Sequence, residues 1–164
     1  MIIIVEGIDR VGKTTLCNKL QKELQLQIFK HKNKDFDYKK MDNENETDKM
    51  LQLLQLNSYC KETAIIFDRF CWSDIVYGTL ERNYDMAEAM RNLDKIEIEL
   101  VKQNALIILM ESEDLIRSSL EHGANLKQYD ILFEKIYKIS RVKRVKCSYT
   151  KINEIANAIA RGEL

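Results

Sequence analysis

Residues 1–15 have the sequence MIIIVEGIDRVGKTT, which contains a phosphate-binding pattern in its usual structural setting. The β-branched run from Ile2 to Val5 predicts a buried strand. It leads into Gly7-x-x-x-x-Gly12-Lys13-Thr14, which agrees with the phosphate-binding loop at every defined position. Thr14 to Leu26 then has the spacing of an amphipathic helix. A strand, a glycine loop and a helix in this order predict a site for a nucleoside triphosphate. The structural alternative is an ordinary strand–helix turn with a solvated lysine.

The residue types in this loop suit phosphate binding. Gly7 and Gly12 allow turns that a Cβ would prevent, so backbone N–H groups can point at phosphate oxygens. The following helix directs its positive N-terminal end at the same anion. Lys13 can reach the β- and γ-phosphates, and the Thr14 hydroxyl is the expected Mg²⁺ ligand. We therefore expect ATP and Mg²⁺, with the nucleotide held by the loop residues Gly7, Ile8, Asp9, Arg10, Val11, Gly12, Lys13, Thr14 and Thr15.

Length and composition favour one cytoplasmic domain over residues 1–164. Lys plus Arg and Asp plus Glu both number 26, so no basic field indicates nucleic-acid binding. No apolar run approaches the roughly 20 residues that a membrane span needs, and the chain starts directly with a strand, which argues against a signal peptide. The scattered cysteines predict reduced thiols rather than disulfides or a zinc site.

The rest of the chain alternates between apolar runs and amphipathic segments. Further strands are predicted at 27–31, 64–67, 105–110 and 142–149, the last of them at a sheet edge. Helices are predicted at 48–61, after an acidic and polar segment at 42–47 that suits a helix start, and at 72–82, 85–103, 112–121 (stopped by His122-Gly123), 126–140 and 152–161. This alternation predicts an α/β fold with a parallel sheet of about five strands and helices on both faces. In such a sheet the ligand lies at the carboxyl ends of the strands.

Polar side chains follow the predicted strands at that edge. Asp68 ends a strand and is a candidate Mg²⁺ partner, although it could instead cap the next helix. Arg69 has a planar fork that suits bidentate contact with phosphate. Within the loop, Arg10 would bring positive charge to the transferring phosphoryl group. Asp9 could accept a hydrogen bond from a sugar or help to place the metal. The alternative for both Asp9 and Arg10 is a surface position in a tight loop. The lysine-rich segment 30–40 is either a solvated loop or a source of one anion-binding lysine.

Two motifs give the chain a resemblance to the thymidylate kinase family. Members have the loop G-x-D-x-x-G-K-[ST], here GIDRVGKT, and the segment D-R-Y-x-x-S-x-x-A-Y-Q, here DRFCWSDIVYG over residues 68–78. Asp68, Arg69, Ser73 and Tyr77 match the second motif, whereas Phe70, Val76 and Gly78 depart from it. The resemblance implies a three-layer P-loop kinase fold, of a compact viral or phage type because family members are typically longer. A viral member would act in the host cytoplasm.

The resemblance also implies roles for individual residues. Asp9 would contact the 3′-hydroxyl of the acceptor, Arg10 would assist catalysis, and Arg69 would bind the acceptor monophosphate. The substrate site would also include Phe70, Ser73 and Tyr77, with Tyr77 against the deoxyribose. Arg117 would lie near the donor adenine, at the start of a lid over about 118–129. A homodimer is a further implication. The aromatic residue that would stack on the acceptor base has no clear counterpart, and the candidates are Phe36, Tyr38 and Tyr59.

These observations predict a deoxynucleoside monophosphate kinase that transfers the γ-phosphate of ATP to dTMP or a related deoxynucleotide. Lys13, Arg10, Arg69 and Asp9 are the predicted catalytic residues. One alternative is a deoxynucleoside kinase, which needs a carboxylate base after the second strand, where lysines precede Asp35. A second alternative is a catalytically inactive nucleotide-binding module. A GTPase switch is disfavoured, because the guanine-recognition motif N-K-x-D is missing.

Overall fold

The computed structural model describes residues 1–30, 43–59, 64–112 and 123–164. It contains a five-stranded parallel sheet with the strand order β2-β3-β1-β4-β5. The strands are β1 (Ile2–Glu6), β2 (Gln27–Lys30), β3 (Ile65–Asp68), β4 (Leu106–Met110) and β5 (Lys143–Cys147). The predicted α/β fold is confirmed, and β5 lies at an edge of the sheet, as its sequence pattern indicated.

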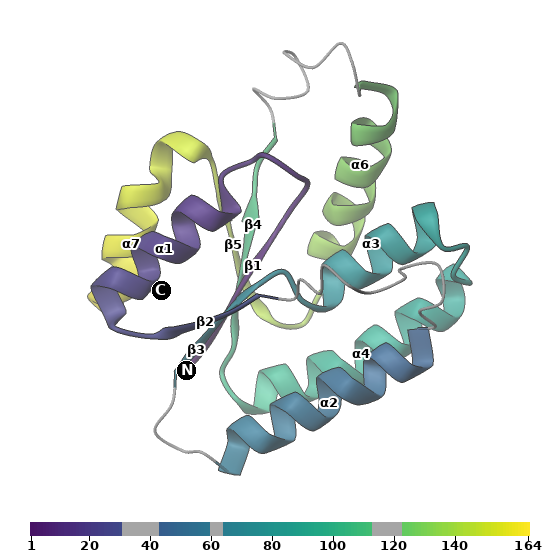
Figure 1. Cartoon of the computed structure of the whole chain (residues 1–164), viewed down its shortest axis with the longest axis horizontal. Coiled ribbons are helices and arrows are strands. Elements are labelled where there is room, and N and C mark those ends of the chain that lie inside the picture. Colours follow the sequence, from purple (N-terminus) through teal and green to yellow (C-terminus); the bar gives the residue numbers. More distant parts are fainter. Residues whose placement is uncertain (31–42, 60–63, 113–122) are drawn as a thin grey trace.

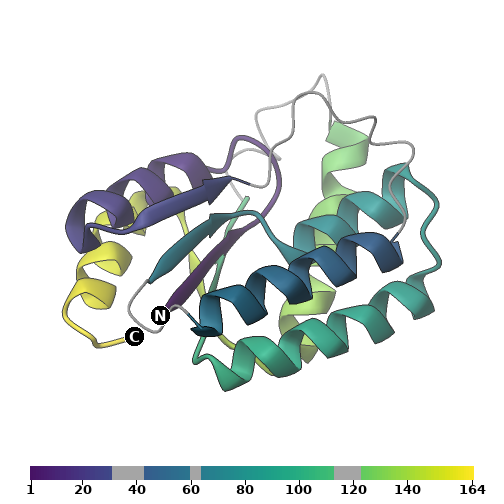
Figure 2. The same ribbon diagram turned by 60° about the horizontal axis from the view of Figure 1, so that its bottom comes forward.

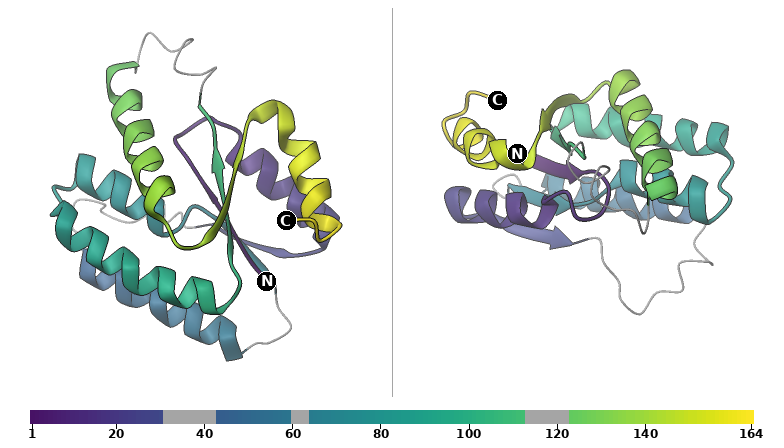
Figure 3. Two further views of the ribbon diagram at one scale, coloured as in Figure 1. Left: turned by 180° about the vertical axis from the view of Figure 1, so that it is seen from behind. Right: turned by 90° about the horizontal axis from the view of Figure 1, so that it is seen from above.

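Helices cover both faces of this sheet (Figure 1). On one face, α1 (Lys13–Leu24) packs against α7 (Ile152–Ala160), which follows the short 3₁₀ turn η2 (Tyr149–Lys151). The other face carries α2 (Asn43–Tyr59), α3 (Cys71–Glu81), α4 (Met86–Lys102) and α6 (Gly123–Ile139). Figures 2 and 3 show the sheet and its two layers of helices from other directions. The chain thus has the three-layer arrangement that its strand–helix alternation predicts.

The core follows from the apolar strand sequences. Ile2, Ile3, Ile4 and Val5 are all completely buried, because β1 lies in the middle of the sheet and has helices on both sides. All five residues of β4 are buried as well. The register pairs Val5 with Asp68, so the chain that leaves β1 and the chain that leaves β3 emerge side by side. That edge of the sheet is where ligands bind in open parallel sheets.

The structure differs from the sequence prediction mainly at helix ends. α2 begins at Asn43, within the acidic segment predicted to suit a helix start, and its acidic first turn stabilises that start. Gly123 was expected to stop a helix but is the first residue of α6. The helix expected before it, and the aromatic candidates Phe36 and Tyr38, lie outside the described residues.

Two further findings bear on composition. Cys17, Cys71 and Cys147 are buried, whereas Cys60 lies outside the described residues. Across the described ranges, none of the helices combines the length and apolar character that crossing a membrane requires.

Candidate active site

The loop between β1 and α1 has the backbone geometry that a phosphate cradle needs. Gly7 has a φ of 135°, and a Cβ there would lie 2.9 Å from the carbonyl oxygen of Met110. Gly12 has a φ of 92°, and a Cβ there would lie 2.6 Å from a ring carbon of Tyr149. Both positions therefore require glycine, for backbone conformation and for space. The loop is therefore packed tightly between the end of β4 and the segment after β5.

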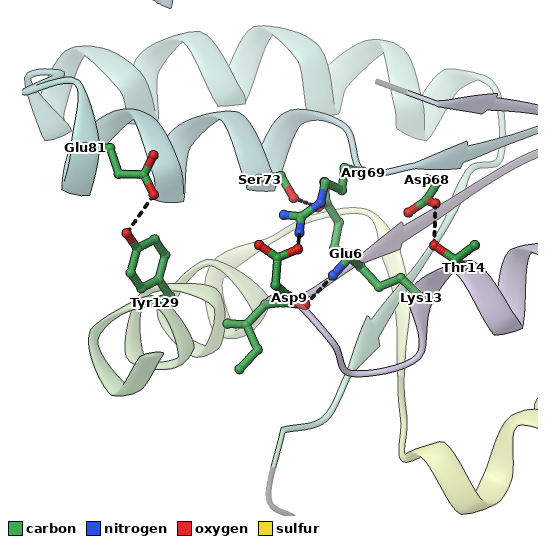
Figure 4. Close-up of polar contacts among 10 residues, drawn as sticks. Glu6, Asp9, Lys13, Thr14, Asp68, Arg69, Ser73, Glu81 and Tyr129 are labelled. Carbon is green, nitrogen blue, oxygen red and sulfur yellow. Dashed lines mark hydrogen bonds and ion pairs between the residues drawn. The ribbon is translucent and has the colours of Figure 1, made fainter. Parts of the chain in front are cut away.

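Lys13 lies within this loop and is almost fully buried, with 6% of its surface exposed. Its ammonium group donates a hydrogen bond to the backbone oxygen of Ile8, so it is folded back over the loop (Figure 4). Burial and then the nearby Arg69 charge lower the pKa of Lys13 to about 8, against the opposing effects of Asp9 and Asp68. The loop thus holds a buried cation whose ammonium group bonds a backbone oxygen of the loop itself, where the phosphates of a nucleotide could replace that oxygen.

The two residues predicted to hold the metal lie together. The Thr14 hydroxyl donates a 3.1 Å hydrogen bond to a carboxylate oxygen of Asp68 (Figure 4). Thr14 lies in the first turn of α1 and Asp68 ends β3, so this contact joins two segments separated by 54 positions. A hydroxyl and a carboxylate at the mouth of a phosphate loop form a hard oxygen donor set, which fits Mg²⁺.

Arg69 follows directly at the tip of β3. Its φ is 72°, a left-handed conformation that is uncommon for a residue with a side chain. Its guanidinium donates to the Asp9 carboxylate and lies over the ring of Tyr77, 4.8 Å from the ring centroid. Only 13% of the Arg69 side chain is exposed, against 66% for Asp9. The arginine is thus oriented between the phosphate loop and α3.

These groups surround one cavity of about 310 Å³. Its walls come from the phosphate loop, the start of α1, the tip of β3 and the segment after β5. The lining residues are Asp9, Arg10, Gly12, Lys13, Thr14, Thr15, Asp68, Arg69 and Tyr149. Arg10 is exposed and has a φ of 67°. The structure therefore brings together the residues predicted for catalysis and for the metal.

Other predicted residues lie elsewhere. Ile8, Val11 and Phe70 are buried and belong to the core, so only their backbone can face a ligand. Ser73 is also buried, and its hydroxyl donates to Glu6. Arg117 and the first part of the predicted lid lie outside the described residues. Tyr59, a candidate for base stacking, is 83% exposed at the end of α2. The chain continues from there to the start of β3, whereas the site lies at the carboxyl ends of the strands.

The last part of the predicted lid belongs to helix α6 and faces α3. Tyr129 lies with its ring centroid 5.0 Å from that of Tyr77, and its hydroxyl donates a 2.7 Å hydrogen bond to Glu81 (Figure 4). Burial, followed by the bond to Glu81, raises the pKa of Tyr129. Arg69, Tyr77 and Tyr129 therefore form a row of contacting side chains that borders the site on its α3 side.

Gly78, where the family motif has glutamine, is explained by packing. A Cβ at this position would lie 2.2 Å from a ring carbon of Tyr84. We expect Gly78→Ala to lower the free energy of unfolding by about 2 kcal/mol, because the ring must shift. In a Tyr84→Ala background the same change should be neutral or stabilising, since alanine is the better helix former. Denaturant unfolding of the four proteins measures both effects. An equal loss in the two backgrounds would show that the contact with Tyr84 is not the cause.

Sequence reasoning missed two residues of this region. Glu6 is a carboxylate inside an otherwise apolar buried strand, and that contrast was the available signal. Tyr149 comes two residues after the end of β5, so the rule that ligands lie at strand ends could have identified it. It is 61% exposed and covers Gly12.

No family model matches the chain. A curated relative is the SPbeta prophage-derived uncharacterized protein YorR of Bacillus subtilis (strain 168), which is 30% identical over 119 residues, covering 73% of this chain and 67% of the relative. A solved structure of YorR from Bacillus subtilis, in complex with phosphorylated GDP, has a TM-score of 0.79 and 23% identity, with coverage of 99% of this chain and 95% of that chain.

Solved kinases share the fold at lower similarity. Thymidylate kinase from Ehrlichia chaffeensis has a TM-score of 0.65 and 15% identity, covering 100% of this chain and 98% of that one. Deoxyadenosine kinase from M. mycoides, with products dCMP and dCDP bound, has a TM-score of 0.60 and 18% identity, with coverage of 98% and 100%. The resemblance to thymidylate kinases is confirmed in the fold, and a prophage-derived relative agrees with a phage-type member. The chain belongs to the family of the prophage-derived protein YorR and has the P-loop fold of thymidylate and deoxyadenosine kinases.

Proposed function

We propose that the chain is a deoxynucleoside monophosphate kinase that transfers the γ-phosphoryl group of ATP to dTMP or a related deoxynucleotide. The observation that carries this proposal is the position of Arg69, a largely buried arginine that shares one cavity with Lys13 of the phosphate loop. One cation suits the donor phosphates, and the other suits a second phosphate opposite them. The nucleotides in the solved complexes of YorR and of the fold neighbours support a nucleotide ligand.

In the proposed reaction, an oxygen of the acceptor phosphate attacks the γ-phosphorus of ATP, and the bond from that phosphorus to the β–γ bridging oxygen breaks. ADP leaves with the electron pair. The acceptor oxygen is already anionic, so no general base has to remove a proton. Mg²⁺, when bound, would neutralise charge on the donor phosphates. Thr14 and Asp68 would hold it, since their oxygens already lie 3.1 Å apart at the loop.

The protein side chains supply position and charge. Lys13 would exchange its bond to the Ile8 oxygen for the β- and γ-phosphates, where its charge is partly shielded from water. Arg69 would orient the acceptor phosphate with its fork, while Asp9 holds the guanidinium from the solvent side. Arg10, exposed at the cavity, would stabilise charge on the transferring group. Tyr77 would contact the acceptor sugar from beneath Arg69.

The proposal is tested by ADP release with ATP and Mg²⁺ and with dTMP, dUMP, dGMP, dCMP, dAMP or thymidine offered separately. We expect turnover with at least one monophosphate, none with thymidine, and loss of turnover when EDTA removes Mg²⁺. Turnover with thymidine alone would instead identify a deoxynucleoside kinase. If every acceptor is silent although ATP binds in calorimetry, the chain is a binding module and the proposed function is wrong.

A further inference from the structure

Glu6 is a charged residue at the end of an otherwise apolar strand. It directly precedes Gly7, the first glycine of the phosphate loop, and it is completely buried. A buried carboxylate is unfavourable unless it accepts hydrogen bonds. Burial raises the pKa of Glu6, against the opposing effects of the Ser73 hydroxyl and the Arg69 charge. Such a group in the centre of the sheet calls for an explanation.

Its hydrogen bonds all come from the segment that follows β3. One carboxylate oxygen accepts from the backbone N–H groups of Phe70 and Trp72, each at 3.0 Å. The other oxygen accepts from the Ser73 hydroxyl. Phe70 is the N-cap residue of α3 and has no side chain that could cap the helix. Glu6 belongs to a different strand, yet it accepts hydrogen bonds from the N–H groups at the start of α3 that have no partner within the helix. A negative charge is favourable at this end of a helix.

Arg69 lies in the middle of this arrangement. Its own N–H donates to the backbone oxygen of Val5 at 3.0 Å, so consecutive residues of β1 hold the chain on both sides of it. A left-handed arginine is strained by about 1 kcal/mol or more and persists only where the surroundings hold it. The bonds to Val5 and Glu6 are the contacts that do so. They also fix Asp68, the preceding residue, beside Thr14.

We propose that Glu6 is a positioning residue: by holding the β3–α3 turn against β1, it fixes Arg69 and Asp68 at the separation from the phosphate loop that phosphoryl transfer requires. This inference rests on the proposed function. Glu6 itself is not one of the residues that line the cavity. Glu6 connects the two sides of the site. The phosphate loop follows it directly in the chain, and the β3–α3 turn is bound by its carboxylate.

The chain offers a matched control for this role. Glu97, on α4, is also buried, and it accepts hydrogen bonds from the Trp72 indole at 3.3 Å and from the Arg141 backbone N–H at 2.9 Å. Its bonds are of the same kind as those of Glu6 but do not reach Arg69. A purely structural carboxylate should behave like Glu97.

The experiment compares Glu6→Gln and Glu6→Asp with Glu97→Gln and Glu97→Asp. Glutamine removes the charge, and aspartate keeps the charge but withdraws it by about 1.5 Å. We expect both Glu6 variants to lose about 10- to 100-fold in kcat/KM for the acceptor, because Arg69 and Asp68 are then held less accurately beside the phosphate loop. Both Glu97 variants should change melting temperature only. Glu6 variants whose kinetics match those of the Glu97 variants would overturn the proposal.

A second readout does not depend on turnover. The ¹H–¹⁵N NMR signals of Arg69, from its backbone amide and its side-chain Nε–H, are assigned by comparison with Arg69→Lys. Both Glu6 variants should shift these signals and speed the hydrogen exchange of the amide, and the Glu97 variants should not. If the wild-type chain turns over no acceptor, the proposed function fails, and these signals alone decide the role of Glu6. Unchanged Arg69 signals in the Glu6 variants would refute it.

Discussion

Replacing Arg69 with alanine is expected to reduce kcat/KM for the acceptor by about a thousandfold, equivalent to about 4 kcal/mol of transition-state stabilisation. The reason is its setting. Only 13% of the side chain is exposed, so its charge is weakly screened by water. Tyr77 and Asp9 already hold the guanidinium in place, so little conformational freedom is lost when the acceptor binds. Steady-state kinetics with saturating ATP and the preferred acceptor measure the loss.

Two controls separate position from charge. Arg69→Lys keeps the charge but loses the planar fork, and it should recover no more than about a tenth of the wild-type rate. Arg161→Ala removes an exposed arginine that is paired only locally with Glu163, and it should leave the kinetics unchanged. Near-normal turnover by Arg69→Ala would remove the residue from the mechanism. A lowered affinity for ATP alone would move Arg69 to the donor side.

The parts of the fold that the sequence predicted are those encoded by local pattern. The β-branched run of β1, the glycine loop and the amphipathic α1 follow one another directly, so each supports the interpretation of the next. The rule that ligands lie at the carboxyl ends of parallel strands predicts Asp68 and Arg69 as site residues. It succeeded because parallel strands place their carboxyl ends at one edge, and the register of Val5 with Asp68 does so here.

The parts that the sequence did not predict depend on long-range packing. Glu6 finds its partners more than 60 positions away, and no local pattern encodes that destination. Tyr129 contacts the ring of Tyr77 on α3, and these two segments meet only through tertiary packing. Gly123 carries the usual signal for a helix end, and the packing of α6 against α3 outweighs that preference.

Replacing Lys13 with methionine is expected to reduce kcat by about a thousandfold or more and to weaken ATP binding. The variant lacks the ammonium group that lies over the phosphate loop. Methionine keeps the buried apolar stem, so the fold should be retained. Lys102→Met, at an exposed lysine paired with Glu99 on α4, is the matched control and should have no kinetic effect. Turnover by Lys13→Met within tenfold of wild type would exclude this lysine from the transfer step.

The pKa of about 8 for Lys13 predicts how both ATP affinity and stability depend on pH. In the nucleotide-free protein the amine loses its charge as pH rises through 8, so ATP affinity in calorimetry should fall by up to about tenfold per pH unit above 8. Stability should move in the opposite direction. The unfolded chain keeps the proton up to about pH 10.5, so between pH 8 and 10.5 the unfolded state binds more protons and stability rises with pH. The part of each pH dependence that is due to Lys13 should be missing from Lys13→Met. It is obtained by comparing this variant with wild type over the same pH range. If ATP affinity stays flat from pH 7 to 9.5 in the wild-type protein, the buried amine is not the group that attracts the donor phosphates.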